Sequence, residues 1–178
     1  TINRQIKDIE KLVNEFSDFA RMPRPILKKT NIINLIKRSL EFVKMSSGSS
    51  LNFKNEKNLM YINGDEDQLN RVFINLIKNS EEAFFDKLKK DPNFKGNIDI
   101  EIIDNNEYII CMLTDNGPGI TDPKKAMTPY YTTKKTGTGL GLPIVSKIIN
   151  EHLGKFSLNN KKKGTGTVIS IFLPKYNA

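Results

Sequence analysis

Residues 65 to about 88 constrain the fold most, because they predict one long helix with a single apolar face. Asp65 can cap the helix start, and Gln68 three residues later completes a capping-box pattern. The apolar residues recur at steps of three and four, namely Leu69, Val72, Phe73, Leu76, Ile77, Ala83 and Phe84. A helix with one apolar face needs a second layer of structure to pack against.

Strands on both sides of this helix supply that second layer. Two runs, NIDIEII at 97–103 and YIICMLTD at 108–115, predict a β-hairpin across the turn DNNE. We expect further strands at 51–54, 59–62, 155–158 and 167–173, and further helices after a cap at Thr30 and around 143–152. This order predicts an α+β fold, a two-layer α/β sandwich of a mixed, mostly antiparallel sheet with helices on one face.

A separate helix precedes this domain. Its apolar residues form one narrow stripe, consisting of Ile2, Ile6, Ile9, Leu12 or Val13, Phe16 and Phe19. A lone helix with such a stripe needs a partner, either within the domain or in a second chain. Pro23 and Pro25 then end the helix. We expect a helical segment at 1–22, a linker at 23–30 and the folded domain at 31–178. Because the first residues already have a helical pattern, the chain is expected to be part of a longer protein.

Composition excludes several classes of protein. The net charge is +8, but five of the 28 basic residues are arginine and the lysines are scattered without interleaved aromatic residues, so nucleic-acid binding is not expected. No apolar run approaches the roughly 20 residues that cross a bilayer. The single cysteine, Cys111, lies in an apolar run, which predicts a buried, unreactive thiol and a reducing compartment.

Polar residues gather on one flank of the long helix. At 100° per residue, Arg71, Asn75, Asn79 and Glu82 point in similar directions beside the apolar face. Asparagine is a mediocre helix former, so a pair of asparagines one turn apart calls for an explanation. Two interpretations remain open from these residues alone. The flank is either a hydrogen-bonded helix edge or a pair of carboxamides facing a polar ligand, with one oxygen available to Mg²⁺.

Two glycine-rich segments offer further binding chemistry. In TDNGPGI, Asp115 leaves a strand and can accept a hydrogen bond from an exocyclic amine, while Gly117 and Gly119 let a flat ring approach the backbone; an ordinary turn is the alternative. In GTGLGLP, backbone amides freed by glycine precede a helix start, an arrangement that binds anions. The spacing matches neither the P-loop nor the dinucleotide fingerprint.

Taken together and in this order, these segments resemble the ATP-binding catalytic domain of sensor histidine kinases, within the gyrase/Hsp90/MutL-like ATPase superfamily. The matching motifs are NLIKNSEEA (75–83) for the N box, DNGPGI (115–120) for the G1 box, PYYTTK (129–134) for the F box, GTGLGL (137–142) for the G2 box and GTGT (164–167) for the last glycine motif. The segment LVNEFSDFARMPRP (12–25) further resembles nitrogen-regulation kinases of the NtrY type.

The resemblance implies a site for ATP and Mg²⁺. Asn79 is implied as the metal ligand, with Asn75 and Glu82 beside the phosphates as the other catalytic residues. Asp115 is implied to bind the adenine amino group, helped by Thr167 through water. The remaining implied contacts to the nucleotide are Gly117, Gly119, Ile120, Lys134, Thr138, Gly139, Leu140 and Gly141, and 121–136 is implied to form a short mobile lid.

The resemblance also implies a function and partners. The chain would donate the γ-phosphate of ATP to a histidine, from which a response-regulator aspartate takes it. It would dimerise through an N-terminal helical hairpin and form the cytoplasmic part of a membrane-bound kinase. The family's acceptor motif is missing here, and the one histidine, His152, matches a structural position. Three alternatives remain: a serine/threonine kinase of the anti-sigma-factor type, a conformational ATPase, or a degenerate module that binds no nucleotide. ATPases of this kind carry glutamate where Asn75 stands, so slow hydrolysis is expected.

Overall fold

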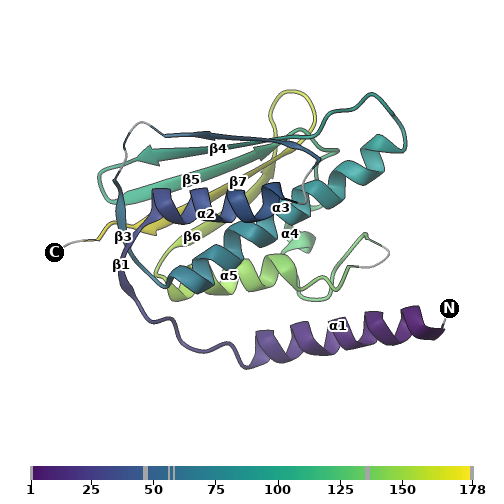
Figure 1. Ribbon diagram of the computed structural model, residues 1–178, viewed down its shortest axis with the longest axis horizontal. Coiled ribbons are helices and arrows are strands. Elements are labelled where there is room, and N and C mark those ends of the chain that lie inside the picture. The colour runs from purple at the N-terminus through teal and green to yellow at the C-terminus, as the bar shows by residue number, and fades with distance from the viewer. Residues whose placement is uncertain (1, 46–47, 56, 58, 135–136, 177–178) are drawn as a thin grey trace.

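The computed structural model describes residues 2–45, 48–55, 57, 59–134 and 137–176, and it confirms the expected α+β sandwich (Figure 1). In chain order the elements are α1 (Ile2–Ala20), β1 (Lys28–Asn31), α2 (Ile32–Lys44), β2 (Ser50–Lys54), β3 (Tyr61–Gly64), α3 (Glu66–Leu88), β4 (Asn97–Asp104), β5 (Tyr108–Asp115), α4 (Pro123–Ala126), α5 (Gly141–Glu151), β6 (Lys155–Asn160) and β7 (Thr167–Pro174). The short helix α4 interrupts a stretch in which the sequence indicated only irregular structure.

The main sheet has five strands in the order β2-β4-β5-β7-β6. The β4–β5 and β6–β7 neighbours are antiparallel hairpins, and β5 also pairs antiparallel with β7. In contrast, β2 pairs parallel with β4, because the chain returns from β2 to the sheet by way of α3. The sheet is therefore mixed and mostly antiparallel, as expected.

Strand β3 does not pair with its sequence neighbour β2. It pairs antiparallel with β1 in a separate two-stranded sheet, from Lys28 opposite Gly64 to Asn31 opposite Tyr61. The small sheet lies at the end of the domain where α3 begins (Figure 1). It thereby fixes the position of the first turn of α3.

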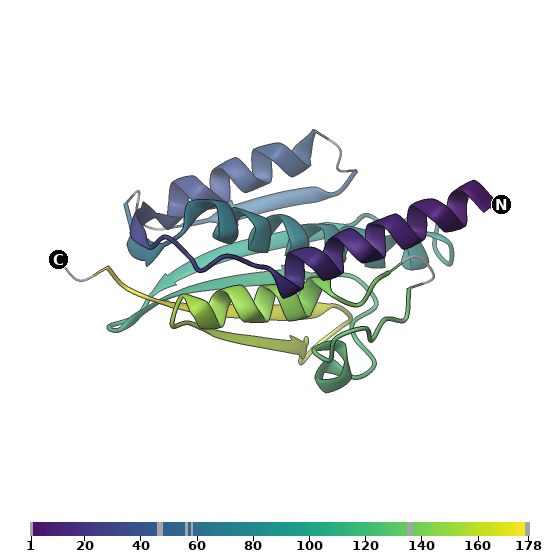
Figure 2. The same ribbon diagram turned by 90° about the horizontal axis from the view of Figure 1, so that it is seen from below.

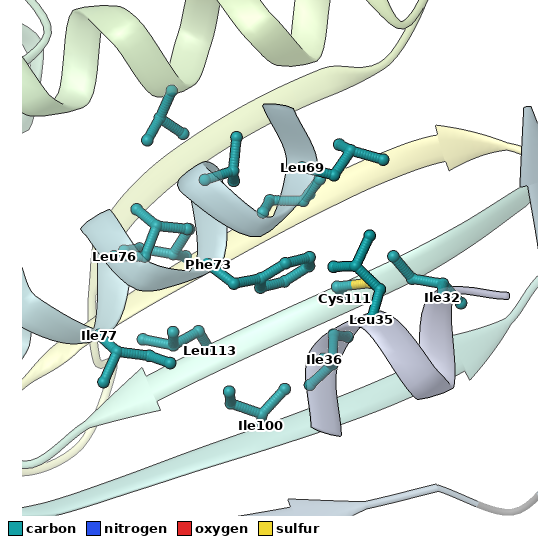
Figure 3. Close-up of a cluster of buried hydrophobic side chains, with 14 of the residues drawn as sticks. Ile32, Leu35, Ile36, Leu69, Phe73, Leu76, Ile77, Ile100, Cys111 and Leu113 are labelled. Atoms are coloured by element: carbon teal, nitrogen blue, oxygen red, sulfur yellow. The ribbon is translucent and has the colours of Figure 1, made fainter. Parts of the chain in front are cut away.

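Helices α2, α3 and α5 cover one face of the main sheet (Figure 2). Their apolar faces and the facing strands form one core, and Figure 3 shows Phe73 of α3 within this cluster, close to side chains of α2 and the sheet. Phe73 is 1% exposed. Cys111 is also buried there, and burial raises the pKa of its thiol to about 12, so the expectation of an unreactive thiol is confirmed.

The buried face of α3 differs from the expected apolar face at Ser80 and Ala83. Ser80 occupies a buried position, whereas Ala83 is only half-buried and lines a cavity. The Ser80 hydroxyl lies 3.3 Å from Leu76 O, within reach of the carbonyl one turn back. A small hydroxyl therefore occupies a place where the periodicity alone predicts an apolar side chain.

Of the two predicted helix caps, one is confirmed in part and the other is wrong. Asp65 caps α3 as expected, with its Oδ1 accepting the backbone N–H groups of Asp67 and Gln68. The reciprocal half of the capping box is wrong, because Gln68 donates to Pro23 O, and the Asp65 N–H donates to His152 Nε2 instead. The cap at Thr30 is also wrong. Asn31 caps α2 by accepting the Ile33 N–H, whereas the Thr30 hydroxyl donates to Gly64 O across the small sheet.

Helix α1 lies outside the sandwich, beside the edge that carries α5 (Figures 1 and 2). Its C-terminal end contacts α5, since Lys147 Nζ donates to Phe19 O at 3.0 Å. Four of its apolar side chains are exposed by about half: Ile6, Ile9, Val13 and Phe16. The side chain of Ile2, also part of the expected stripe, lies outside the described residues. Among the helices described, none is long and apolar enough to cross a membrane.

Candidate functional site

One cavity of about 510 Å³ opens between α3, α5 and the chain that connects β5 to α5. The polar flank of α3 forms one wall, and all four of its expected residues, Arg71, Asn75, Asn79 and Glu82, line the cavity. Of the two interpretations left open by the sequence, this placement favours a ligand-facing flank. The apolar side chains of Ile144, Leu158 and Ile169 line the inner part of the cavity. Such a mixture of an apolar interior with a few polar groups is typical of a small-molecule site.

Asp115 is held rigidly at the inner end of the cavity. The residue is 4% exposed, and its Oδ1 accepts the backbone N–H groups of Gly117 at 2.8 Å and Thr167 at 3.1 Å. Oδ2 lies 3.3 Å from the hydroxyl of Ser80. One oxygen is therefore occupied by the protein backbone, whereas the other retains capacity for a donor that enters the cavity.

The last glycine motif holds Asp115 from the opposite side. Gly166 has φ +129°, and a Cβ atom at this position would overlap the carbonyl oxygen of Asp115. Only glycine fits there, and its close approach brings the Thr167 N–H group to the carboxylate. The contact joins β7 to the end of β5, 52 residues apart in the chain.

A pair of hydrogen bonds fixes the segment that follows Asp115. The side chain of Asn160 accepts the Ile120 N–H at 2.7 Å and donates to the Ile120 carbonyl at 2.7 Å. Gly119, at φ +84°, lies so close that a Cβ would be 2.8 Å from Asn160 Oδ1. This role of Asn160 could not be predicted, because one asparagine at a strand end in an asparagine-rich chain has no distinguishing pattern.

Two glycines at the start of α5 pack against different neighbours. Gly139, at φ +71°, packs against the backbone of Tyr130 and Tyr131, where a Cβ would come within 2.5 Å of Tyr130 C. Gly141 is the first residue of α5 and faces Asn79, with room for a Cβ at 3.5 Å from Asn79 Nδ2. The helix start therefore lies against the asparagine that the family resemblance assigns to the metal.

A cationic group already lies at this junction. Lys134 Nζ is 2.6 Å from Glu82 Oε2 and 3.4 Å from Asn79 Oδ1, and it also lies 3.5 Å from the Asn79 carbonyl. Oxygen donors that hold an ammonium are also suited to a hard divalent cation, so these residues fit Mg²⁺. No group of three His, Cys, Asp or Glu side chains in the described part of the chain could hold a metal. A metal at this place therefore needs additional ligands from a nucleotide or water.

Most of the residues implied as ligand contacts line the cavity. These are Asn75, Asn79, Glu82, Asp115, Gly119, Ile120, Lys134, Thr138, Gly139, Gly141 and Thr167. Gly117 and Leu140 lie behind the lining. Gly117 is buried between Asp115 and Phe84, and Leu140 is fully buried in the core. Lining residues that the sequence did not single out include Lys78, Asp86, Tyr131 and Leu158. Residues 135 and 136 of the expected lid lie outside the described residues.

His152 is not available as a nucleophile. It is 2% exposed, its Nε2 accepts the Asp65 N–H at 3.0 Å, and its Nδ1 lies 2.8 Å from the Ile148 carbonyl. Nδ1 therefore carries the proton. Burial lowers the pKa of His152, although the Ile148 carbonyl and nearby carboxylates act in the opposite direction. The expectation that this histidine is structural agrees with these bonds.

Comparisons with known proteins find a matching family and relatives of similar sequence. Residues 64–177 match the family described as histidine kinase-, DNA gyrase B- and HSP90-like ATPase. The nitrogen regulation protein NtrY of Azorhizobium caulinodans is 31% identical over 97% of this chain, which spans 23% of that protein. The chain thus spans about a quarter of the length of the first curated relatives that it matches.

Two solved structures resemble the fold. The catalytic domain of the histidine kinase ThkA is 28% identical and has a TM-score of 0.71, covering 84% of this chain and 97% of that domain. Full-length ShkA in complex with AMPPNP has a TM-score of 0.77 over 98% of this chain and 38% of that protein. At 21% identity, the ShkA likeness shows the fold alone.

Proposed function

Because this chain belongs to the histidine kinase-, DNA gyrase B- and HSP90-like ATPase family, we propose that its cavity binds ATP with Mg²⁺ and presents the γ-phosphate to a histidine. The observation that carries the proposal is that one cavity brings together groups suited to the base and groups suited to the phosphates. It has a rigid carboxylate at its inner end, apolar side chains beside it, and the asparagine flank of α3 next to the start of α5 at its outer end. Each end suits a different part of the nucleotide.

The inner end suits adenine. Asp115 Oδ2 can accept the exocyclic amine, since Oδ1 is occupied by two backbone N–H groups. The apolar side chains of Ile144, Leu158 and Ile169 offer faces for the flat ring. A rigid acceptor in a mostly apolar pocket selects for a base with an amine, because a carbonyl at the same place would face an unpaired carboxylate.

The outer end suits the phosphates and their metal. Asn79 Oδ1 and the Glu82 carboxylate would hold the cation, with the phosphates completing its coordination. Held by these residues, Mg²⁺ would supply positive charge against the phosphates. The backbone amides at the start of α5, next to Gly141, offer donors to the same anionic groups. Asn75 is a neutral amide and cannot remove a proton from water, so this site favours transfer over hydrolysis.

The acceptor must come from outside this chain. His152 is buried with both ring nitrogens in hydrogen bonds, and the chain has no other histidine. In the full-length protein we expect an acceptor histidine on a helical hairpin that includes α1, and a homodimer formed through that hairpin. The exposed apolar stripe of α1 supports this part of the proposal. A response regulator would then take the phosphoryl group, and a cytoplasmic location within a membrane-bound kinase stays a prediction.

Calorimetric titration with a non-hydrolysable ATP analogue tests the binding site. The unmodified chain should bind the analogue more tightly with Mg²⁺ than in EDTA. In Asn79→Ala this difference should fall by about tenfold or more, because the metal loses its one protein amide ligand. Asn150→Ala is the matched control, since Asn150 is an exposed helix asparagine outside the cavity.

Two results would refute the proposal. One is the absence of heat and of thermal stabilisation by the Mg²⁺-bound analogue. The other is an unchanged metal dependence in Asn79→Ala, which would contradict the assignment of the metal to α3. Labelling with γ-phosphate-labelled ATP in the full-length protein tests the second half, since label should reach a histidine outside this chain.

A further inference from the structure

Lys134 links the loop before α5 to the polar flank of α3. Its ammonium bonds to Glu82 and reaches both oxygens of Asn79, while its own N–H group donates to Thr132 Oγ1 at 3.1 Å. The side chain is about one-third exposed, against about one-half for Glu82. Residues of α3 and of the loop between α4 and α5 both line the cavity, so this bond joins two of its walls.

The place that Lys134 Nζ takes is the place where the proposed metal would bind. Both cations require Asn79 Oδ1, and both gain from the Glu82 carboxylate. An ammonium and a divalent cation within about 4 Å of each other repel strongly in a partly desolvated site. The Lys134 ammonium and the metal therefore cannot occupy this place together, and binding of the metal requires that the ammonium leaves.

From this competition we infer that Lys134 is a built-in placeholder cation. It holds the loop against α3 and neutralises Glu82 while the metal is absent, and it is displaced when nucleotide arrives with Mg²⁺. Displacement breaks the bond to Glu82 and frees residues 128–134 from α3. Metal binding and release of the loop are thereby one coupled event. The inference rests on the proposed nucleotide site, and it adds a role for Lys134 that differs from that of a fixed phosphate ligand.

The inference predicts opposite effects of Lys134→Met with and without metal. In EDTA, the variant leaves Glu82 unneutralised beside the nucleotide phosphates, so affinity for ADP should fall by roughly fivefold, the size expected for one partly exposed charge pair. With saturating Mg²⁺, the variant should bind ADP as tightly as the unmodified chain or more tightly, because the metal no longer has a competitor. Lys124→Met, which removes an exposed lysine of α4, is the matched control and should change neither affinity.

A double variant separates this role from simple phosphate binding. If Lys134 acts by neutralising Glu82, then adding Glu82→Gln to Lys134→Met should restore the metal-free affinity to within about twofold, since no carboxylate remains to repel the phosphates. A fixed phosphate ligand predicts a different pattern. Lys134→Met would then weaken binding equally with and without Mg²⁺, and Glu82→Gln would restore nothing. Either of these results overturns the inference.

Hydrogen exchange supplies a readout that does not depend on nucleotide. Without ligand, Lys134→Met should raise amide exchange at 128–134 above that of Lys124→Met, because the loop loses its bond to α3. Unchanged exchange there would contradict the placeholder role even if nucleotide binds as proposed. Conversely, failure of the unmodified chain to bind ADP with Mg²⁺ would reject the nucleotide site, while the exchange result would still report on the bond between Lys134 and Glu82.

Discussion

Replacing Asp115 with asparagine removes one charge and changes the hydrogen-bonding group that faces the cavity. The asparagine carbonyl can keep the place of Oδ1 and accept the N–H groups of Gly117 and Thr167. Its amide nitrogen then takes the place of Oδ2, near the Ser80 hydroxyl. The carboxamide presents a donor where the carboxylate presents an acceptor. We therefore expect Asp115→Asn to fold normally and to lose affinity for an amine-bearing base.

The magnitude follows from two contributions. A hydrogen bond to a charged acceptor contributes about 1.5–3 kcal/mol, and a buried donor left without a partner costs about 1–3 kcal/mol. Because the two terms overlap in part, we expect a net loss of about 2–4 kcal/mol. That loss corresponds to a rise in Kd of about 30- to 1,000-fold. Stability without nucleotide should change by less than about 1 kcal/mol, since the two backbone bonds are retained.

Calorimetry with ADP and Mg²⁺ measures the affinity, and urea unfolding without nucleotide measures the stability. Asp67→Asn is the control, because Asp67 is an exposed aspartate at the start of α3, outside the cavity. A Kd for Asp115→Asn within about threefold of the unmodified chain would refute the assignment of Asp115 to the base. A large loss of stability would instead show that the carboxylate charge is required for the fold.

Two further predictions concern stability. Gly166→Ala should lower the free energy of unfolding by about 2–4 kcal/mol, because its Cβ would overlap the Asp115 carbonyl oxygen. The control, Gly164→Ala, has φ +76° and open space around it, so it should lower the free energy of unfolding by only about 1 kcal/mol. Equal urea midpoints for the two variants would contradict the packing argument. His152 has a folded-state pKa below its ordinary value of 6.5, so the unfolded chain binds the proton more readily. Stability should be constant above pH 6.5 and decrease as the pH falls from 6.5 towards the folded-state pKa. His152→Gln should remove this decrease in urea midpoints measured between pH 7.5 and about 5, and its persistence would assign the effect to another group.

Local patterns in the sequence determined the elements and most of the wall of the site. The periodicity of α3 indicated both its core face and the flank that carries Asn75 and Asn79, because a helix turns by a fixed angle at each residue. Alternation and the turn at 105–107 likewise determined the β4–β5 hairpin. The order of five motifs was enough to indicate the family. These features depend on residues close together in the chain, and their geometry follows from local backbone rules.

Local rules failed where a neighbouring element competed for the same group. Thr30 is a suitable cap by residue type, but its hydroxyl donates to Gly64 O across the β1–β3 pair, and the next residue, Asn31, caps α2. Gln68 has the right spacing for a capping box, but the Asp65 N–H donates to His152 Nε2 instead. In both cases a group from a distant segment formed the bond that the local pattern would assign elsewhere.

The tertiary structure alone decided which distant groups meet. The bond of Lys134 to Glu82 joins residues 52 apart, and that of Asn160 to Ile120 joins residues 40 apart. The parallel pairing of β2 with β4 depends in the same way on the path of the chain around α3. No periodicity encodes such pairs, because they depend on how the helices and strands pack as complete units, and packing is set by the shape and burial of all the apolar faces together.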